Sequence, residues 1–230
     1  MSRLWAPTVY LSGDGRLTSA PPTSGPASTT FTYDPGSPVP TIGGNVSNRL
    51  KDGAYDQRER PEFHGSRPPY LPLRARQDVI VFQSDPLSED VTVIGPIEVV
   101  LHVSSTAIDT DFTAKLVDVY PPSPDYPAGF DLNISDALVR MRYRDQKQTG
   151  ELIEPGRVYP VSIRPFPTAN VFKKGHRIRL DVSSSNFPRF DPNPNTGESL
   201  GKHRRVITAD NTIHHSGVYP SRVELSIVSR

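Results

Sequence analysis

One short pattern in the sequence could carry nucleophilic catalysis. Residues 197–201 spell Gly-Glu-Ser-Leu-Gly, which matches the nucleophile elbow, where a serine sits on a strained turn between a strand and a helix. An enzyme built on this motif would use Ser199 with a histidine such as His203 as its base. Pro192 and Pro194 precede the motif and would interrupt the strand that the elbow requires. We therefore predict a surface loop here, and no catalytic residue in this chain.

Carboxylates and histidines offer a second possible chemistry. Asp109 and Asp111 could form an acid–base pair, but Asp at the entry to a strand more often bonds the backbone of a turn. His214 and His215 are adjacent, so on a strand they would point to opposite faces and could not easily share one metal ion. We expect structural roles for these residues, no metal site and no cofactor. The histidines considered are His64, His102, His176, His203, His214 and His215.

Two segments could bind a ligand without catalysing a reaction. Arg140, Arg142 and Arg144 alternate along the chain. On a strand they would form an anion-binding stripe, or else a solvated face or a set of cross-strand salt bridges. Residues 187–195 combine Phe, Arg, Asp, Asn and Pro, a composition that suits sugar hydroxyls and also suits ordinary turns. We favour the structural interpretation for both segments.

The strands that would position these groups are predicted from alternating apolar and polar residues. In residues 137–143 the alternation places Met141 and Tyr143 inward and the three arginines outward. In residues 176–182 it sets Leu180 and its apolar neighbours opposite charged residues. Weaker patterns occur at residues 8–11, 29–33 and 78–82. The clearest runs are residues 99–103, 112–116, 137–143, 176–182 and 223–227.

The spacing of turn residues completes the predicted fold class. The chain has 25 prolines and 16 glycines among 230 residues, and no amphipathic helix of ten residues, so many short strands and turns are expected. We predict an all-β protein, an antiparallel jelly-roll β-sandwich with few short helices, forming one domain over residues 1–230. Residues 12–76 are polar and rich in Pro, Gly and Ser, and a loop of that length is expected to lie on another surface.

Composition excludes several classes of function. The 26 basic and 25 acidic residues give a net charge of +1, which offers no electrostatic argument for binding nucleic acid or a membrane surface. The absence of cysteine rules out disulfides, thiolate metal sites and a cysteine nucleophile. No apolar run is long enough to span a membrane, and the first residues do not resemble a signal peptide. A cytoplasmic location is therefore favoured.

Several longer stretches are more specific than any of these motifs. These stretches are residues 34–44 with 56–58, residues 103–119, residues 170–172 with 175–178, and residues 183–191 with 195–197. In order along the chain, they resemble the C-terminal domain of the cocaine esterase and X-Pro dipeptidyl-peptidase (CocE/NonD) family of serine hydrolases. The likeness covers nearly the whole sequence, from about Trp5 to the end.

The resemblance implies a galactose-binding-like jelly roll that accompanies an α/β-hydrolase domain, in the same parent protein or as a separate chain. In this family the Ser-Asp-His triad lies in the hydrolase domain, and no position of this chain matches a triad residue. The part that faces the acyl pocket follows the Gly-Gly pair, which here places Val46, Ser47 and Asn48 nearest the active site. Relatives of the cocaine esterase type carry bulky apolar residues there. Residues 12–76 would then pack on the hydrolase domain.

Three hypotheses therefore remain open from the sequence. The first is a non-catalytic domain of an esterase or X-Pro dipeptidyl-peptidase, which shapes the substrate pocket and stabilises the enzyme. The second is a stand-alone jelly-roll module that binds sugar or peptide. The third is an enzyme in its own right that uses Ser199. Self-association of the domain is possible in each case.

Overall fold

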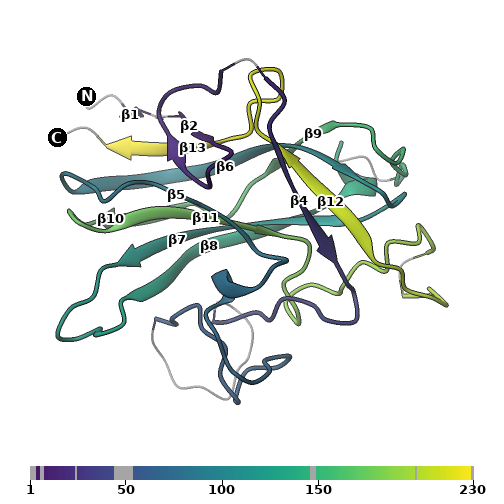
Figure 1. Ribbon diagram of the computed structural model, residues 1–230, viewed down its shortest axis with the longest axis horizontal. Helices are drawn as coiled ribbons and strands as arrows, with labels where there is room; N and C mark the ends of the chain where they lie inside the picture. The colour runs from purple at the N-terminus through teal and green to yellow at the C-terminus, as the bar shows by residue number, and fades with distance from the viewer. Residues whose placement is uncertain are drawn as a thin grey trace.

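Two antiparallel sheets form the molecule (Figure 1). The computed structural model describes residues 4–5, 8–23, 25–43, 54–145, 149–199 and 201–228. The strands are β1 (Leu4–Trp5), β2 (Thr8–Leu11), β3 (Leu17–Thr18), β4 (Ser28–Tyr33), β5 (Ile80–Gln83), β6 (Val91–Ser105), β7 (Asp111–Tyr120), β8 (Phe130–Arg140), β9 (Tyr159–Ile163), β10 (Thr168–Phe172), β11 (Arg177–Ser183), β12 (Ala209–His214) and β13 (Arg222–Val228). Two short 3₁₀ helices interrupt them, η1 (Leu73–Ala75) and η2 (Met141–Tyr143).

The large sheet is organised around β6, and the small sheet around β7 and β11. In the large sheet the order is β3-β2-β13-β6-β12-β4, with β9 and β10 also paired to β6 and β1 paired to β13. The 15 residues of β6 can hold four partners because each partner pairs with only part of its length. The small sheet has the order β5-β11-β7-β8. This arrangement confirms the predicted antiparallel β-sandwich.

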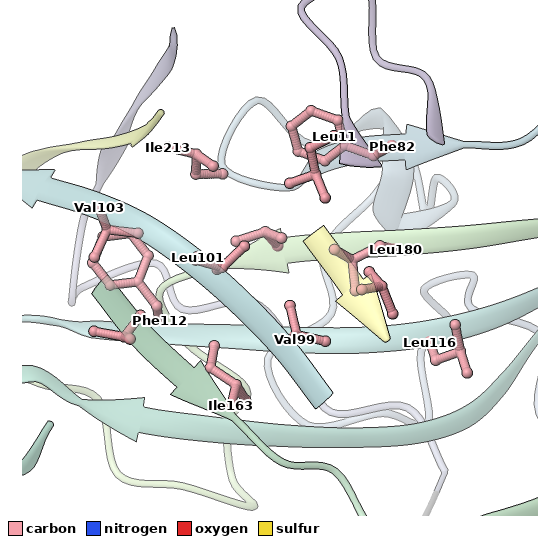
Figure 2. Close-up of a cluster of buried hydrophobic side chains, with 14 of the residues drawn as sticks. Leu11, Phe82, Val99, Leu101, Val103, Phe112, Leu116, Ile163, Leu180 and Ile213 are labelled. Atoms are coloured by element: carbon pink, nitrogen blue, oxygen red, sulfur yellow. The ribbon is translucent and has the colours of Figure 1, made fainter. Parts of the chain in front are cut away.

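The core lies between the two sheets and comes from the alternation seen in the sequence. Val99, Leu101 and Val103 of β6 face Phe112 of β7 and Leu180 of β11 across the interior (Figure 2). All five side chains are fully buried. Burying an aliphatic or aromatic side chain of this size stabilises the folded state by roughly 1.5–3 kcal/mol. The inner faces of both sheets therefore supply the main cohesive free energy of the domain.

The three weaker patterns also mark strands. Residues 8–11 coincide with β2, residues 29–33 lie within β4, and residues 78–82 overlap β5 with a shift of two positions. The shift has a local cause, because the Arg76 side chain bonds the Asp78 carboxylate through its Nε and Nη2, each at 2.8 Å. That contact holds the chain in a turn before β5 begins.

The prediction for residues 137–143 is wrong at its end. β8 stops at Arg140, and Tyr143 belongs to η2 with 36% of its surface exposed instead of pointing inward. The backbone N–H of Met141 donates to the Thr110 carbonyl at 2.9 Å, and that of Arg142 donates to the Asp109 carboxylate at 3.0 Å. These bonds close a turn where the alternation alone would continue the strand.

Candidate functional site

Two loop segments cover the outer face of the small sheet. We call them the cover: residues 34–43 and residues 54–79. In Figure 1 they lie below β7 and β8 together with η1. A second apolar cluster ties the two segments to each other, apart from the core between the sheets. Its buried members are Val39, Ile42, Phe63, Leu73 and Val79.

Charged side chains fill the space between the cover and the sheet. Arg179 of β11 is fully buried, with its Nε 2.8 Å from Asp181 and its Nη1 2.8 Å from Asp131 of β8. Arg74 of the cover also pairs with Asp131. Arg179 and Asp181 of β11 therefore lie under the cover and not in solvent. A buried guanidinium is tolerated only when carboxylates compensate its lost hydration, and here two do.

Lys115 links the centre of the sheet to the cover. It is 7% exposed, and its Nζ donates to Gln57 Oε1 at 2.8 Å. The Gln57 amide in turn donates to the carbonyls of Ile42 and Tyr55, each at 3.2 Å. Burial lowers the pKa of Lys115 to about 8, an effect that the nearby carboxylate of Asp181 opposes.

This link ties the residues before positions 44–53 to the residues after them, because Gln57 bonds the carbonyls of both Ile42 and Tyr55. Gly43 ends one side with φ of +75°, and a Cβ added there would lie 2.4 Å from the Tyr55 ring. Only glycine satisfies both conditions without displacing the ring. The Tyr55 ring packs edge-on against Phe63, with 6.2 Å between centroids. Val46, Ser47 and Asn48 lie outside the described residues, and their place beside an acyl pocket stays a prediction.

The loop that could have bound sugar instead holds the cover in place. The backbone N–H of Thr41 donates to the Phe187 carbonyl at 2.7 Å, and that of Phe187 donates to the Val39 carbonyl at 2.9 Å. Arg189 pairs with the buried carboxylate of Asp136, which also accepts a bond of 2.7 Å from Asn186 Nδ2. These polar groups are engaged within the domain, which agrees with the structural interpretation of residues 187–195.

The carboxylates of Asp109 and Asp111 hold together one end of the sandwich. Arg142 pairs with Asp109 and Arg140 with Asp111, each at 2.8 Å, and Asn193 Nδ2 donates to both carboxylates at 3.0 and 2.8 Å. Burial raises the pKa of Asp111 to about 6, against the opposing effects of Arg140 and Asn193. Both carboxylates are fully buried and engaged by arginine and asparagine side chains, as expected for groups with a structural role.

The stripe of arginines is thereby explained by ion pairs. Arg140 and Arg142 bind those two carboxylates, and Arg144 donates through Nη1 to the carbonyls of Met141 and Glu151 at 3.0 and 2.7 Å. None of the three forms a free anion-binding face. Of the interpretations open from the sequence, cross-strand pairing fits Arg140, which faces Asp111 directly in the β7–β8 register.

Ser199 lacks the surroundings of a catalytic nucleophile. It is exposed, and residues 191–199 and 201–208 contain neither a strand nor a helix. The neighbouring Glu198 bonds the Thr196 hydroxyl at 2.8 Å, and its carbonyl accepts a bond from Arg142 at 3.0 Å. His203 is also exposed. The loop therefore matches the prediction made from its prolines.

Three of the histidines considered from the sequence form hydrogen bonds within the domain. His214 bonds Ser104 at 2.9 Å, His215 bonds Thr29 at 3.0 Å, and His176 bonds the Asp118 carboxylate at 2.9 Å. Across the described part of the chain, no group of three or more His, Cys, Asp or Glu side chains is arranged to hold a metal ion. Within the same residues, no helix has the length and apolar character needed to span a membrane.

Sequence reasoning missed the roles of Lys115 and Gln57. Both lie in stretches that resemble the hydrolase family, residues 103–119 and 56–58. That likeness was the available signal, but it assigned no role to either side chain. Their contact joins positions 58 residues apart in the chain, and alternation within one strand carries no information on such a pair.

Comparison with known proteins places the chain among the non-catalytic C-terminal domains of hydrolases. The family model described as the X-Pro dipeptidyl-peptidase C-terminal non-catalytic domain matches residues 2–224. The cocaine esterase of Rhodococcus sp. (strain MB1 Bresler) is 41% identical over 204 residues, which are 87% of this chain and 32% of that protein. This chain therefore spans about a third of the curated relative.

Solved structures agree in fold. An aminopeptidase from the marine sediment archaeon Thaumarchaeota archaeon superposes with a TM-score of 0.81 at 26% identity, over 98% of this chain and 37% of that one. An α-amino acid ester hydrolase gives 0.82 at 28% identity, over 96% and 36%. A CocE/NonD family hydrolase from Staphylococcus aureus, with 0.61 at 15% identity over 98% and 37%, shares the fold.

Proposed function

The chain belongs to the family of X-Pro dipeptidyl-peptidase C-terminal non-catalytic domains. We therefore propose that it is the non-catalytic C-terminal domain of a serine acyl hydrolase. The parent enzyme cleaves esters or amides through an acyl-enzyme intermediate. An α/β-hydrolase domain, in the same protein or on a separate chain, carries the triad. This sandwich completes the substrate pocket and stabilises the assembly.

One observation carries the proposal. The chain is 41% identical to a cocaine esterase along 87% of its own length, yet it covers only 32% of that protein. The names of the similar solved proteins, an aminopeptidase and an amino acid ester hydrolase, add that related sandwiches accompany acyl-transfer chemistry on both amides and esters. The exposed, unsupported Ser199 agrees with a domain that performs no chemistry itself.

The pocket-facing residues are proposed to be Val46, Ser47 and Asn48. The Lys115–Gln57 link and Gly43 fix the described residues on both sides of them. Ser47 and Asn48 are smaller or more polar than the bulky apolar residues expected from the family resemblance. The acyl site of the parent enzyme is therefore proposed to be wider or more polar than that of the cocaine esterase type.

The first test is hydrolysis of p-nitrophenyl esters by the purified chain, before and after treatment with a fluorophosphonate probe. We expect neither turnover nor covalent labelling, and a Ser199→Ala variant should behave in the same way. Turnover that the probe abolishes, with the label on Ser199, would instead make residues 197–201 an active site. Mixing the chain with its hydrolase domain should restore or raise esterase activity.

The second test addresses the pocket. In the assembled enzyme, Ser47→Leu and Asn48→Phe should shift the ratio of kcat/KM values between p-nitrophenyl acetate and p-nitrophenyl benzoate by roughly tenfold, because a filled pocket discriminates by size. Ser123→Leu, in the exposed β7–β8 turn, is the matched control and should leave the ratio unchanged. An equal ratio in all three variants would remove these residues from the pocket.

A further inference from the structure

A cavity of about 460 Å³ opens at the end of the small sheet where β7 turns into β8. Its volume falls within the range of roughly 300–1,000 Å³ that small-molecule sites occupy. Its walls come from the cover, from the β7–β8 turn and from β11. The charged residues that line it are Asp56, Arg58, Arg74, Asp131, Arg177 and Arg179.

The cavity holds more positive than negative charge. Among the described residues that line it, four carry guanidinium groups and two carry carboxylates, and none is a lysine, histidine or glutamate. Asp131 is already shared between Arg74 and the buried Arg179. Asp56 uses one carboxylate oxygen to accept the backbone N–H of Asp131 at 3.0 Å. The acidic groups of the cavity are therefore committed to internal contacts.

Two of the guanidinium groups lack a carboxylate partner at hydrogen-bond distance. Arg58 Nε lies 3.8 Å from Asp56 Oδ2, which is beyond a hydrogen bond. Arg177 Nη1 donates to a neutral group, the Ser84 carbonyl at 2.9 Å. Among the described residues no carboxylate hydrogen-bonds to either side chain. The guanidinium of Arg58 and the remaining donors of Arg177 are open to an oxyanion.

The remaining wall is apolar and fixed in place. Tyr120 packs on Phe130 with 5.8 Å between ring centroids and on His176 with 4.2 Å. His176 is in turn held by the Asp118 carboxylate at 2.9 Å. Pro121 and Pro122, which also line the cavity, follow Tyr120. This side of the cavity can contact a carbon skeleton and offers no further charge.

We propose that this cavity binds a small organic dianion, a short dicarboxylate or a phosphate monoester, through Arg58 and Arg177. Each guanidinium engages one oxyanion group, or both engage one phosphate, and the ligand's two negative charges balance the local excess. The Tyr120 and proline wall contacts the skeleton between or beside the charged groups. The site does not depend on the proposed acyl hydrolase activity, since it uses only residues of this domain.

Calorimetric titration of the chain with glutarate and with glycerol phosphate tests the proposal, at constant ionic strength. We expect saturable binding with one site, no binding of the neutral analogue glutaramide, and a loss of affinity of about tenfold or more in Arg58→Gln and in Arg177→Gln. Arg157→Gln is the matched control, because Arg157 is an exposed arginine that pairs with Glu154 and does not line the cavity. It should bind like the unaltered chain.

Three results of the titrations would contradict a dianion site. Absence of saturable binding, equal affinity for glutaramide, or unchanged affinity in both cavity variants would overturn the proposal. Arg58→Lys keeps the charge but loses the planar fork, so an affinity between those of the unaltered chain and Arg58→Gln supports bidentate recognition. Thermal unfolding of each variant tests whether the fold is retained. If Arg177→Gln fails to fold, the two Arg58 variants decide the question alone.

Discussion

The two faces of the small sheet are both buried, but they are held by different physics. The inner face, with Phe112, Leu116 and Leu180, packs into the apolar core between the sheets. The outer face, with Lys115 and Arg179, is buried under the cover among carboxylates and amides. Apolar packing is insensitive to direction, whereas each buried polar contact requires one geometry. The inner face therefore provides stability, and the outer face fixes where the cover lies.

Truncating the inner face should have the largest effect. Phe112→Ala removes a fully buried ring from the centre of the sandwich, and we expect it to lower the free energy of unfolding by about 3–5 kcal/mol. Denaturant unfolding monitored by circular dichroism measures this change. Phe166→Ala is the control, because Phe166 is 70% exposed and its truncation should leave the midpoint nearly unchanged. Equal losses in the two variants would contradict the assigned core.

Breaking the charge network of the outer face should come next. Arg179→Met keeps most of the side-chain volume but leaves Asp181 and part of Asp131 without a partner, at an expected cost of about 3 kcal/mol. Adding Asp181→Asn should recover part of that loss, because it removes one of the two uncompensated charges. The same denaturant titration on the single and double variants measures both steps. A double variant less stable than Arg179→Met would argue against the pairing.

How far the sequence predicts this molecule depends on which face is considered. Alternation located the strands that carry Val99, Phe112 and Leu180, because a core side chain repeats at every second position. The outer face shows the same alternation with charged residues, and a buried charged face is indistinguishable from a solvated one by pattern. Burial of Arg179 follows from the cover, whose residues 54–79 have no period that places them on the sheet.

The candidate site was predicted in part, and for reasons that differ from residue to residue. The prolines before Ser199 were sufficient to predict a loop, since their effect on a strand is local. The proposed pocket residues, such as Ser47, came from family resemblance. Arg58 and Arg177, which line one cavity, are 119 positions apart by their numbers. Only the folded chain brings them to the same wall, so no spacing rule could have paired them.

The pH dependence of the free energy of unfolding tests the outer face without a change to the core, because Lys115 titrates there. The unfolded chain keeps Lys115 protonated up to its ordinary pKa of 10.5, whereas the folded chain releases the proton near pH 8. Between these values the unfolded state binds more protons, so the contribution of Lys115 to stability rises with pH, by about 2 kcal/mol from pH 8 to pH 9.5.

Comparison with Lys115→Met isolates this contribution. The variant has no titrating group at the position, so the stability of the unaltered chain minus that of the variant should increase over the same pH interval. Chemical denaturation at pH 7, 8, 9 and 9.5 measures the difference. A difference that stays constant, or that falls as the pH rises, would mean that Lys115 is not desolvated under the cover.

The smallest expected change in stability comes from a substitution that compares the two faces within the single strand β7. Thr113 lies between the core residues Phe112 and Ala114 but points to the outer side, where its hydroxyl bonds Ser183 Oγ at 2.6 Å. Thr113→Val keeps the shape and removes this bond, and we expect a loss of about 1 kcal/mol in the free energy of unfolding. If the outer face behaved like an apolar core, the same substitution would stabilise the chain.

The double variant Thr113→Val/Ser183→Ala completes the argument for this position. It removes both hydroxyls, so neither is left facing a missing partner. The group that then loses a bond is the Ser185 carbonyl, which accepts from the Ser183 hydroxyl at 3.1 Å. Only part of the loss in the single variant should therefore be recovered, because the penalty of the stranded hydroxyl is removed while that of the carbonyl is added. Equilibrium denaturation of the unaltered chain, of Thr113→Val, of Ser183→Ala and of the double variant gives the coupling energy directly. Additive losses would mean that the two hydroxyls are solvated and that the cover does not seal this face of the sheet.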